Sequence, residues 1–424
     1  MISSPHLTRA LALLFSAGVF AGCETPSAPA PSASTAAPQP SSVASTVPPT
    51  VDSAAAHPSP KEADTAIVIG EKQTFHSTIL GEDRTLLVHT PASYKLGDQT
   101  YPVLYLLDAG DNFHHTTGIT AFLSEVGRAP EIIVVGVSNT GDSRERDLTP
   151  TAMKDFPGTG GAAKFLSFLK DEVRPRIEGG YRTAPYRILV GHSLGGLFAL
   201  NVLTTAPEAF DAYIAMSPSL WWDDKVVLHG AEKSFATHPD LQSFVYMTMG
   251  NEPGPMLPDV TAFAALLKTK GPKGVRSELN HMEHESHASS PHRGTYAALE
   301  TLFSGWESPP EVVTLAALKT HYEALSKKLH FEVKLSEDML IGFVYEIAEK
   351  HEDEATAAML LSIQLHPDSP GAYDTLGTLY EHQKKLDLAR ANFETAVRKA
   401  TAISDPGLDG MKVNLARLSK PAAK

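Results

Sequence analysis

The chain has 424 residues, more than one ordinary domain holds, and 42% of them are hydrophobic, enough for a sizeable buried core. Its formal net charge of -13 argues against nucleic acid or an anionic membrane surface as a partner, because the protein's field would repel phosphate. Cys23 is the only cysteine, which excludes an intramolecular disulfide and a cysteine-based zinc site.

The first residues predict export. Residues 1–22 have the layout of a signal peptide, with a weakly basic start, an apolar run from Ala10 to Phe20 and a small Ala-Gly pair. The run is too short to span a membrane. It ends in FAGC, which resembles the lipobox of bacterial lipoproteins, although Phe20 replaces the usual leucine; a plain signal peptide is the alternative. We therefore expect an exported cell-envelope lipoprotein, periplasmic or outer-membrane associated, whose membrane anchor is a lipid on Cys23.

Residues 23–64 form the next segment. They are mostly Pro, Ala, Ser and Thr, with almost no large apolar side chain. Such a sequence cannot bury enough surface to offset its chain entropy, so it predicts a disordered tether between the anchor and a folded domain.

Residues 65–308 predict a catalytic α/β domain. Short β-branched runs alternate with longer helical patterns, which indicates a mostly parallel sheet with helices on both faces. The predicted strands are Arg84–Thr90, Val103–Leu107, Ile132–Val137, Arg187–Val190, Tyr213–Met216 and Phe244–Met249. The predicted helices are Thr117–Arg128, Ala162–Ile177, Leu197–Thr205, Asp259–Lys270 and Arg293–Phe303.

Residues 311–403 predict a small all-α region. Their apolar and small residues have the spacing of tetratricopeptide (TPR) repeats, once clearly and once loosely. The clear copy comprises Tyr373, Leu376, Gly377, Tyr380, Ala389, Phe393 and Ala396, and the looser one Ile341, Gly342, Tyr345, Ala355, Met359 and Pro367. An unrelated helical hairpin is the alternative. Residues 404–424 are expected to be a tail.

The sequence GHSLGG around Ser193 predicts a nucleophile. An apolar strand precedes it and a helix follows it, which is the strand-turn-helix setting of the G-x-S-x-G motif. The glycines leave room for a strained turn, and the helix N-terminus directs free amides at charge that develops on a substrate. A purely structural tight turn is the alternative.

A serine nucleophile needs a base that follows it in the chain. Four histidines lie close together here: His281, His284, His287 and His292. We predict His287 as the base, because it lies in a loop just before the last helix of the domain. A metal site using His284 and His287 is the alternative.

The acid that would orient this histidine should follow the strand Phe244–Met249. The next carboxylate is Glu252. Its rivals are Asp223, Asp224 and Asp259, and Glu252 as an ordinary loop carboxylate also stays open.

Several phrases of the sequence carry a family resemblance. They are YPVLYLLD at residues 101–108, RDLTP at 146–150, GHSLGG at 191–196, SPSLWW at 217–222 and ESHAS at 285–289. Together they make residues 75–303 similar to the putative esterase family, the esterase D and enterochelin-esterase-like branch of the α/β-hydrolases. The resemblance implies an α/β-hydrolase fold, with Ser193 as nucleophile and His287 as base.

The resemblance also implies the remaining site residues. The oxyanion donors would be the amide of Leu194 and that of Ala109 or Gly110. Three further side chains would lie near the substrate mouth: Arg146, Trp221 and Trp222. An Arg146–Asp147 pair that only fixes a loop is the alternative for the arginine. Some siderophore esterases of this group work with a serine–histidine dyad, which competes with Glu252 as a third member.

These observations predict a serine esterase that cleaves carboxylic esters through an acyl-enzyme, on a small-molecule substrate and with no metal or organic cofactor. One alternative is a siderophore esterase of the cell envelope that opens a catecholate trilactone. Acyl transfer to an acceptor other than water would use the same residues. A rival of another class is an envelope interaction protein, which binds a protein partner through its TPR-like repeats and keeps the hydrolase domain as an inactive scaffold.

Overall fold

The computed structural model describes residues 66–95 and 99–418, and the chain from Val68 onward forms one compact unit. The predicted signal peptide, the lipidation site Cys23 and the tether at 23–64 lie outside the described residues. No helix within the described ranges is both long enough and apolar enough to cross a bilayer.

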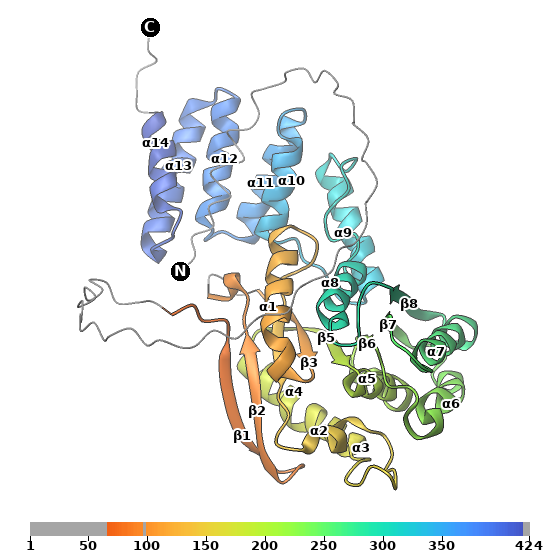
Figure 1. The fold of residues 1–424 in the computed structure, drawn as a ribbon. Helices are drawn as coiled ribbons and strands as arrows, with labels where there is room; N and C mark the ends of the chain where they lie inside the picture. The colour runs from red at the N-terminus through yellow and green to blue at the C-terminus, as the bar shows by residue number, and fades with distance from the viewer. Residues whose placement is uncertain (1–65, 96–98, 419–424) are drawn as a thin grey trace, which may run out of the picture. The chain divides into compact units, whose positions relative to one another are not determined.

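One eight-stranded sheet organises the unit, with the order β1-β2-β4-β3-β5-β6-β7-β8 (Figure 1). Its strands are β1 Glu71–Ser77, β2 Glu82–His89, β3 Tyr101–Leu106, β4 Ile133–Val137, β5 Thr183–His192, β6 Ala212–Met216, β7 Gln242–Gly250 and β8 Gly274–Met282. β2 pairs antiparallel with β1 and with β4, and all other neighbours are parallel. This is the α/β-hydrolase arrangement, so the predicted fold class is confirmed.

Helices cover both faces of the sheet. The face of α5 Leu194–Thr205 also carries α3 Ala162–Phe168, a π-helical segment Leu169–Val173, α4 Arg174–Gly180, α6 Trp222–Thr237 and α7 Met256–Lys270. The other face carries α1 Ala109–Glu125 and α8 Ser290–Leu302. Three short helices complete this part: α2 Ser143–Leu148 and the 3₁₀ turns Ala92–Lys95 and Pro207–Ala209.

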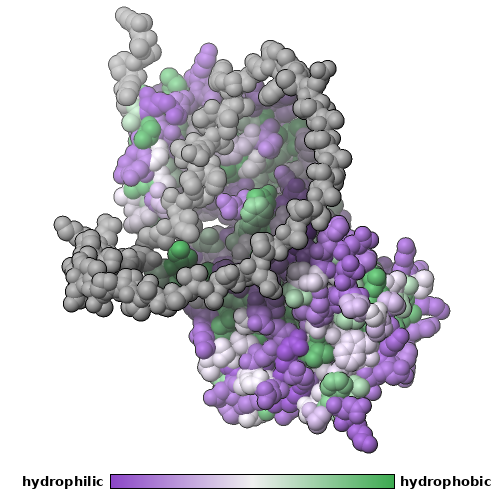
Figure 2. Space-filling view, in the orientation of Figure 1, coloured by the Kyte–Doolittle hydropathy of each residue, from purple (hydrophilic) through white to green (hydrophobic). Residues whose placement is uncertain are grey.

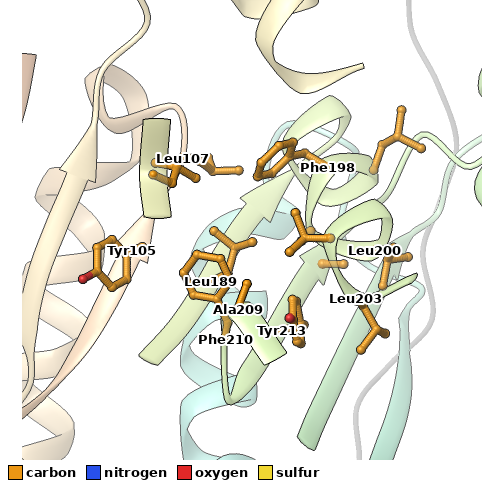
Figure 3. Close-up of a cluster of buried hydrophobic side chains, with 14 of the residues drawn as sticks. Tyr105, Leu107, Leu189, Phe198, Leu200, Leu203, Ala209, Phe210 and Tyr213 are labelled. Atoms are coloured by element: carbon orange, nitrogen blue, oxygen red, sulfur yellow. The ribbon is translucent and has the colours of Figure 1, made fainter. Parts of the chain in front are cut away.

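The sheet is held to α5 by a densely packed apolar cluster. Figure 3 shows Leu189 of β5 among aromatic rings, with Phe198 of α5 above it and Tyr105 of β3 beside it. All three side chains are essentially inaccessible to solvent. Burial on this scale fixes the end of β5 relative to α5, which is the position the chemistry requires.

Two strands were not predicted, β1 and β8, and both lie at the edges of the sheet. Their sequences, EKQTFHS and GVRSELNHM, are rich in polar residues. An edge strand has one neighbour and a largely exposed face, so it lacks the apolar run that reveals a central strand. Helix α6 was also missed; its second to fourth residues, Asp223 to Lys225, are all at positive φ.

The C-terminal part is all-helical, as predicted. Its helices are α9 Leu315–Leu329, α10 Glu337–Ile347, α11 Glu352–Leu365, α12 Pro370–His382, α13 Leu386–Ile403 and α14 Leu408–Arg417. A Cβ at Gly377 of α12 would lie 2.7 Å from the Phe393 ring of α13, so this small residue permits close approach of the two helices. The TPR interpretation stays a prediction. α14 lies in the segment expected to be a tail, where Met411 packs against α13 through Ala396 and Ala400.

The helical region shares a core with the sheet. The apolar cluster under α8 continues from Leu299 to Leu318 of α9 and Leu340 of α10. The ring of Tyr186 on β5 lies 4.9 Å from that of Phe331, which follows α9. On the part of the surface that Figure 2 colours, hydrophilic residues predominate over the sheet domain and apolar residues are scattered.

Candidate active site

Ser193 lies on a sharp turn between β5 and α5. Its φ of 59° and ψ of -116° are strained for any residue with a side chain. Two glycines make the turn possible, because a Cβ at Gly191 would lie 2.2 Å from the Gly195 carbonyl oxygen and one at Gly196 would crowd Pro218 at 3.1 Å. The turn therefore holds the Ser193 hydroxyl at the carboxyl edge of the sheet, ahead of a helix N-terminus.

His287 and Glu252 meet at the same edge. His287 follows β8, Glu252 follows β7, and His287 Nδ1 lies 2.7 Å from Glu252 Oε2. The carboxylate is 4% exposed, so solvent screens this contact little. A carboxylate on Nδ1 leaves Nε2 as the nitrogen available to accept a proton. Of the predicted acids, Glu252 is therefore the one that the structure brings to the histidine.

The second oxygen of Glu252 is held separately. Ser217 Oγ donates to Glu252 Oε1 at 2.5 Å, and the Gly250 amide donates to the same atom at 3.3 Å. Ser217 Oγ also lies 3.2 Å from Ser290 Oγ at the start of α8. Sequence reasoning missed Ser217 as a functional residue, although it lies within the phrase SPSLWW; its signal is its place at the end of β6.

Ser193 and His287 are not hydrogen-bonded to each other in the described part of the chain. Ser193 Oγ instead lies 3.4 Å from Ser219 Oγ, and the His287 ring centroid lies 4.4 Å from that of His192. Catalytic contacts of this kind are commonly long without substrate and tighten once it binds. Burial, aided by the neighbouring His287, lowers the pKa of His192 to about 4, so this ring stays uncharged beside the base at neutral pH.

The predicted oxyanion donors lie at two helix starts. Leu194 is the first residue of α5, and Ala109 and Gly110 are the first two of α1. No described atom accepts a hydrogen bond from these three amides, as expected for the first turn of a helix. Amides with no internal partner can donate to an oxygen that acquires negative charge.

Arg144 of α2 is a residue that sequence reasoning missed. Its guanidinium donates to both carboxylate oxygens of Asp108, the residue directly before Ala109, at 2.8 and 2.9 Å. Arg144 lies in the short helix SRERDL, and no sequence feature distinguishes it from the other charged residues there.

Two of the three predicted substrate-binding residues, Arg146 and Trp222, are engaged in contacts within the protein. Arg146 donates to Glu82 and to Asp147, which corresponds to the structural alternative for this arginine. The hydrogen bond from Arg146 lowers the pKa of the Glu82 carboxyl to about 2. Trp222 is 2% exposed, and its indole N–H donates to Thr151, so it packs rather than faces solvent. Trp221 is 37% exposed, and the Arg146 side chain is 38% exposed despite its ion pairs.

The other residues considered for the site have separate positions. Asp259 is buried and pairs with Lys225 at 2.8 Å, while Asp223 and Asp224 lie in the left-handed start of α6. A cavity of about 570 Å³ between β8 and α8 is lined by residues that include His281, His284 and His292. Across residues 66–95 and 99–418, no three metal-ligating side chains are placed to hold an ion.

Comparison with known proteins agrees with this geometry. Residues 77–290, just over half of the chain, match the model of the family described as Putative esterase. The chain belongs to this family. The matched range contains Ser193, Glu252 and His287.

Two curated esterases and one solved structure illustrate the relationship. Ferri-bacillibactin esterase BesA of Bacillus subtilis is 38% identical over 150 residues, 30% of this chain and 51% of that protein. Siderophore triacetylfusarinine C esterase of Aspergillus fumigatus is 34% identical over 165 residues, 36% of this chain and 56% of that protein. The chain thus spans about half the length of these relatives. An IroE-like serine hydrolase from Shewanella oneidensis is 29% identical with a TM-score of 0.64, covering 70% of this chain and 99% of that one.

Proposed function

We propose that this chain hydrolyses carboxylic esters by two acyl transfers through Ser193. The observation that carries the proposal is the 2.7 Å contact between His287 Nδ1 and the buried Glu252, at the same sheet edge as the strained Ser193. The contact supports a reaction in which Ser193 is the nucleophile, His287 the base and Glu252 the orienting acid.

The reaction would run in two halves. His287 takes the Ser193 proton as Oγ attacks the ester carbonyl, and the amides of Leu194 and of Ala109 or Gly110 stabilise the oxyanion. His287 then gives the proton to the leaving alcohol, which departs and leaves an acyl-serine. Water, deprotonated by His287, attacks the acyl carbonyl. His287 then returns the proton to Ser193 Oγ as the acyl–oxygen bond breaks, which releases the acid and restores the serine.

Hydrolysis of p-nitrophenyl esters of increasing acyl length tests the proposal. Ser193→Ala should reduce kcat by about 10⁶-fold. Ser124→Ala, which alters a half-buried serine near the C-terminal end of α1, is the control and should keep full activity. Failure of the wild type to turn over any ester or to be labelled at Ser193 by a fluorophosphonate would refute it and favour the inactive-scaffold alternative.

For the substrate, we propose the ester bonds of a siderophore such as a catecholate trilactone. The support comes from relatives whose names describe siderophore esterases. The test compares kcat/KM for a catecholate trilactone with that for p-nitrophenyl acetate. A preference of 100-fold or more for the trilactone supports the proposal; a preference for the simple ester supports a general esterase.

We also propose that the protein is exported and anchored to the cell envelope through a lipid on Cys23. In a bacterial host, radiolabelled fatty acid should become covalently attached to the wild-type protein and not to Cys23→Ala. Equal labelling of both proteins would contradict the anchor. The helical region would then bind a protein partner close to the membrane, and loss of that partner on deleting residues 311–424, with the catalytic domain still folded, would support this role.

A further inference from the structure

One side chain of α2 contacts residues that precede both groups of proposed oxyanion donors. Arg144 Nε and Nη2 donate to Asp108 Oδ1 and Oδ2 at 2.8 and 2.9 Å, and Nη2 also approaches the His192 carbonyl oxygen at 3.4 Å. Asp108 directly precedes Ala109, and His192 directly precedes Ser193. A single planar guanidinium therefore spans the residues that lead into both catalytic turns.

Asp108 needs such support because of its backbone. Its φ of 52° and ψ of 46° are left-handed, a state that a non-glycine residue keeps only where its surroundings hold it. The residue is 5% exposed, and Asn139 Nδ2 donates to Oδ1 at 2.7 Å. With Arg144 bound to both oxygens, the carboxylate has little freedom to rotate. The direction of the following amides, Ala109 and Gly110, is fixed by this turn.

The Asp108 carboxylate also lies against the nucleophile turn. A Cβ at Gly195 would lie 3.3 Å from Asp108 Oδ2. Because Gly195 has no side chain, the Asp108 carboxylate can lie against the turn that contains Leu194. Movement of Asp108 would disturb the turn after β3 and the start of α5 together.

Arg144 acts from a rigid base. Three residues later in α2, Asp147 is 1% exposed and accepts from Arg84 Nη1 at 2.7 Å, and Arg84 is itself fully buried. Breaking a buried pair of this kind is strongly unfavourable, so α2 holds its position. The backbone of α2 is therefore held in place, as are the groups that the Arg144 guanidinium contacts.

We infer that Arg144 is a positioning residue, which sets the distance and direction between the Ala109–Gly110 and Leu194 amides by holding Asp108 and the His192 carbonyl together. The inference rests on the proposed function. It assigns to Arg144 no contact with the substrate; the residue acts through the backbone of two turns.

This role predicts a particular kinetic signature. Oxyanion donors interact more strongly with the tetrahedral transition state than with the bound ester, so their misplacement lowers kcat and leaves KM nearly unchanged. Loss of a single oxyanion donor elsewhere costs about 10²–10³-fold in kcat. We expect Arg144→Gln, which disorders the donors without removing them, to lower kcat by about 30- to 100-fold.

Two variants and one control test the inference on the full chain. Arg144→Lys keeps the charge but loses the paired donors, so kcat should fall by about 5- to 10-fold, between wild type and Arg144→Gln. The control is Arg187→Gln. Arg187 lies in the middle of β5, five residues before His192. Its side chain is 25% exposed and pairs with Glu178 at 2.6 Å, so it matches Arg144 in burial and bonding. Its loss should leave kcat within 2-fold of wild type.

A second measurement does not depend on hydrolysis. Hydrogen–deuterium exchange of a peptide covering residues 107–113 should be at least 10-fold faster in Arg144→Gln than in wild type, and unchanged in Arg187→Gln. Unchanged exchange, or an effect on KM alone, would overturn the inference. If the wild type hydrolyses no ester but exchange responds as expected, the proposed function fails while the positioning role of Arg144 stands.

Discussion

The carboxyl edge of the sheet and the C-terminal helices use the same uncommon backbone state for different purposes. Both regions hold non-glycine residues at positive φ. In the helical region these are His330, Lys384 and Ser404, and each lies at or just after the end of a helix, where such a residue ordinarily terminates it. At the sheet edge they are Asp108, Ser193 and Ser217, and each directly follows a strand or lies one residue beyond it.

The difference lies in what the strain accomplishes. At a helix end, the left-handed residue allows backbone amides to hydrogen-bond the last carbonyls of the helix. These bonds offset the conformational strain of that residue. At the sheet edge, the three side chains contact other segments of the chain: Ser217 binds Glu252, Asp108 binds Arg144, and Ser193 has a weak contact with Ser219. Strain in this region therefore orients chemical groups, and its stability must come from the buried sheet beneath.

The sharpest test of this contrast removes the acid from the strained edge. Glu252→Gln cannot stabilise a protonated His287, so kcat should fall by about 10³- to 10⁴-fold while the melting temperature changes little. Glu283→Gln, which alters an exposed carboxylate in the loop that carries His287, serves as the control. Ester hydrolysis and thermal unfolding of both variants are the measurements. Full activity in Glu252→Gln would show that serine and histidine suffice as a dyad.

The converse test alters the regular region. Gly377→Ala places a methyl group 2.7 Å from the buried Phe393 ring, and overpacking should outweigh the gain in helix propensity. We expect a loss of about 2 kcal/mol in the free energy of unfolding with kcat unchanged. Gly342→Ala in α10, where a Cβ would meet no atom within 4 Å, should instead stabilise the protein by about 0.5–1 kcal/mol. Denaturant unfolding distinguishes them; stabilisation by both would contradict the close helix contact.

A pH test addresses the buried imidazole at the sheet edge. Because burial lowers the pKa of His192 from 6.5 to about 4, the unfolded chain binds more protons than the folded one between these values. The stability that the neutral ring contributes is therefore full above pH 6.5 and is lost as pH falls toward 4. Between pH 7 and 5.5, the free energy of unfolding of His192→Gln should fall by about 1 kcal/mol less than that of wild type, as measured by urea unfolding. His281→Gln, an exposed histidine of β8, should follow the wild-type curve; a similar curve for His192→Gln would contradict the assignment.

The smallest expected effect isolates the strain at the nucleophile. Alanine and glycine both abolish the serine hydroxyl, but only glycine relaxes at a φ of 59°. Ser193→Gly should therefore be more stable than Ser193→Ala by about 0.5–1 kcal/mol, although glycine makes the unfolded chain more flexible. Thermal unfolding of the two inactive variants measures the difference. Equal stability would mean that the turn stores no strain.

Much of the fold was visible in the sequence because the central strands are buried on both faces. Val103–Leu107 and Phe244–Met249 appear as apolar runs, and the turn at Ser193 has a motif of its own. The edge strand β8 has neither an apolar run nor a motif, because most of its residues are polar and partly exposed to solvent. The acid was placed by the rule that it follows a strand, and the structure brings Glu252 to His287 as that rule requires.

What sequence could not supply were contacts between distant loops. Arg144 and Arg146 are two residues apart in one short helix, yet one binds Asp108 near the nucleophile turn and the other binds Glu82 of β2. No local pattern distinguishes them, because the direction of each side chain depends on how α2 packs. The family phrase contained Arg146 and drew attention to it, whereas Arg144 was found only from geometry.

The position of β8 has a consequence for how the protein would fail under heat. β8 is the last strand of the sheet, with β7 as its strand partner among the described residues, and the loop with His287 follows directly after it. Edge strands open at lower free energy than central ones, so His287 is carried by one of the least protected parts of the sheet. Ser193 and Leu194, by contrast, extend from its centre. Heating would then separate the base from an intact nucleophile, and activity would disappear as a local and reversible event before the core itself unfolds.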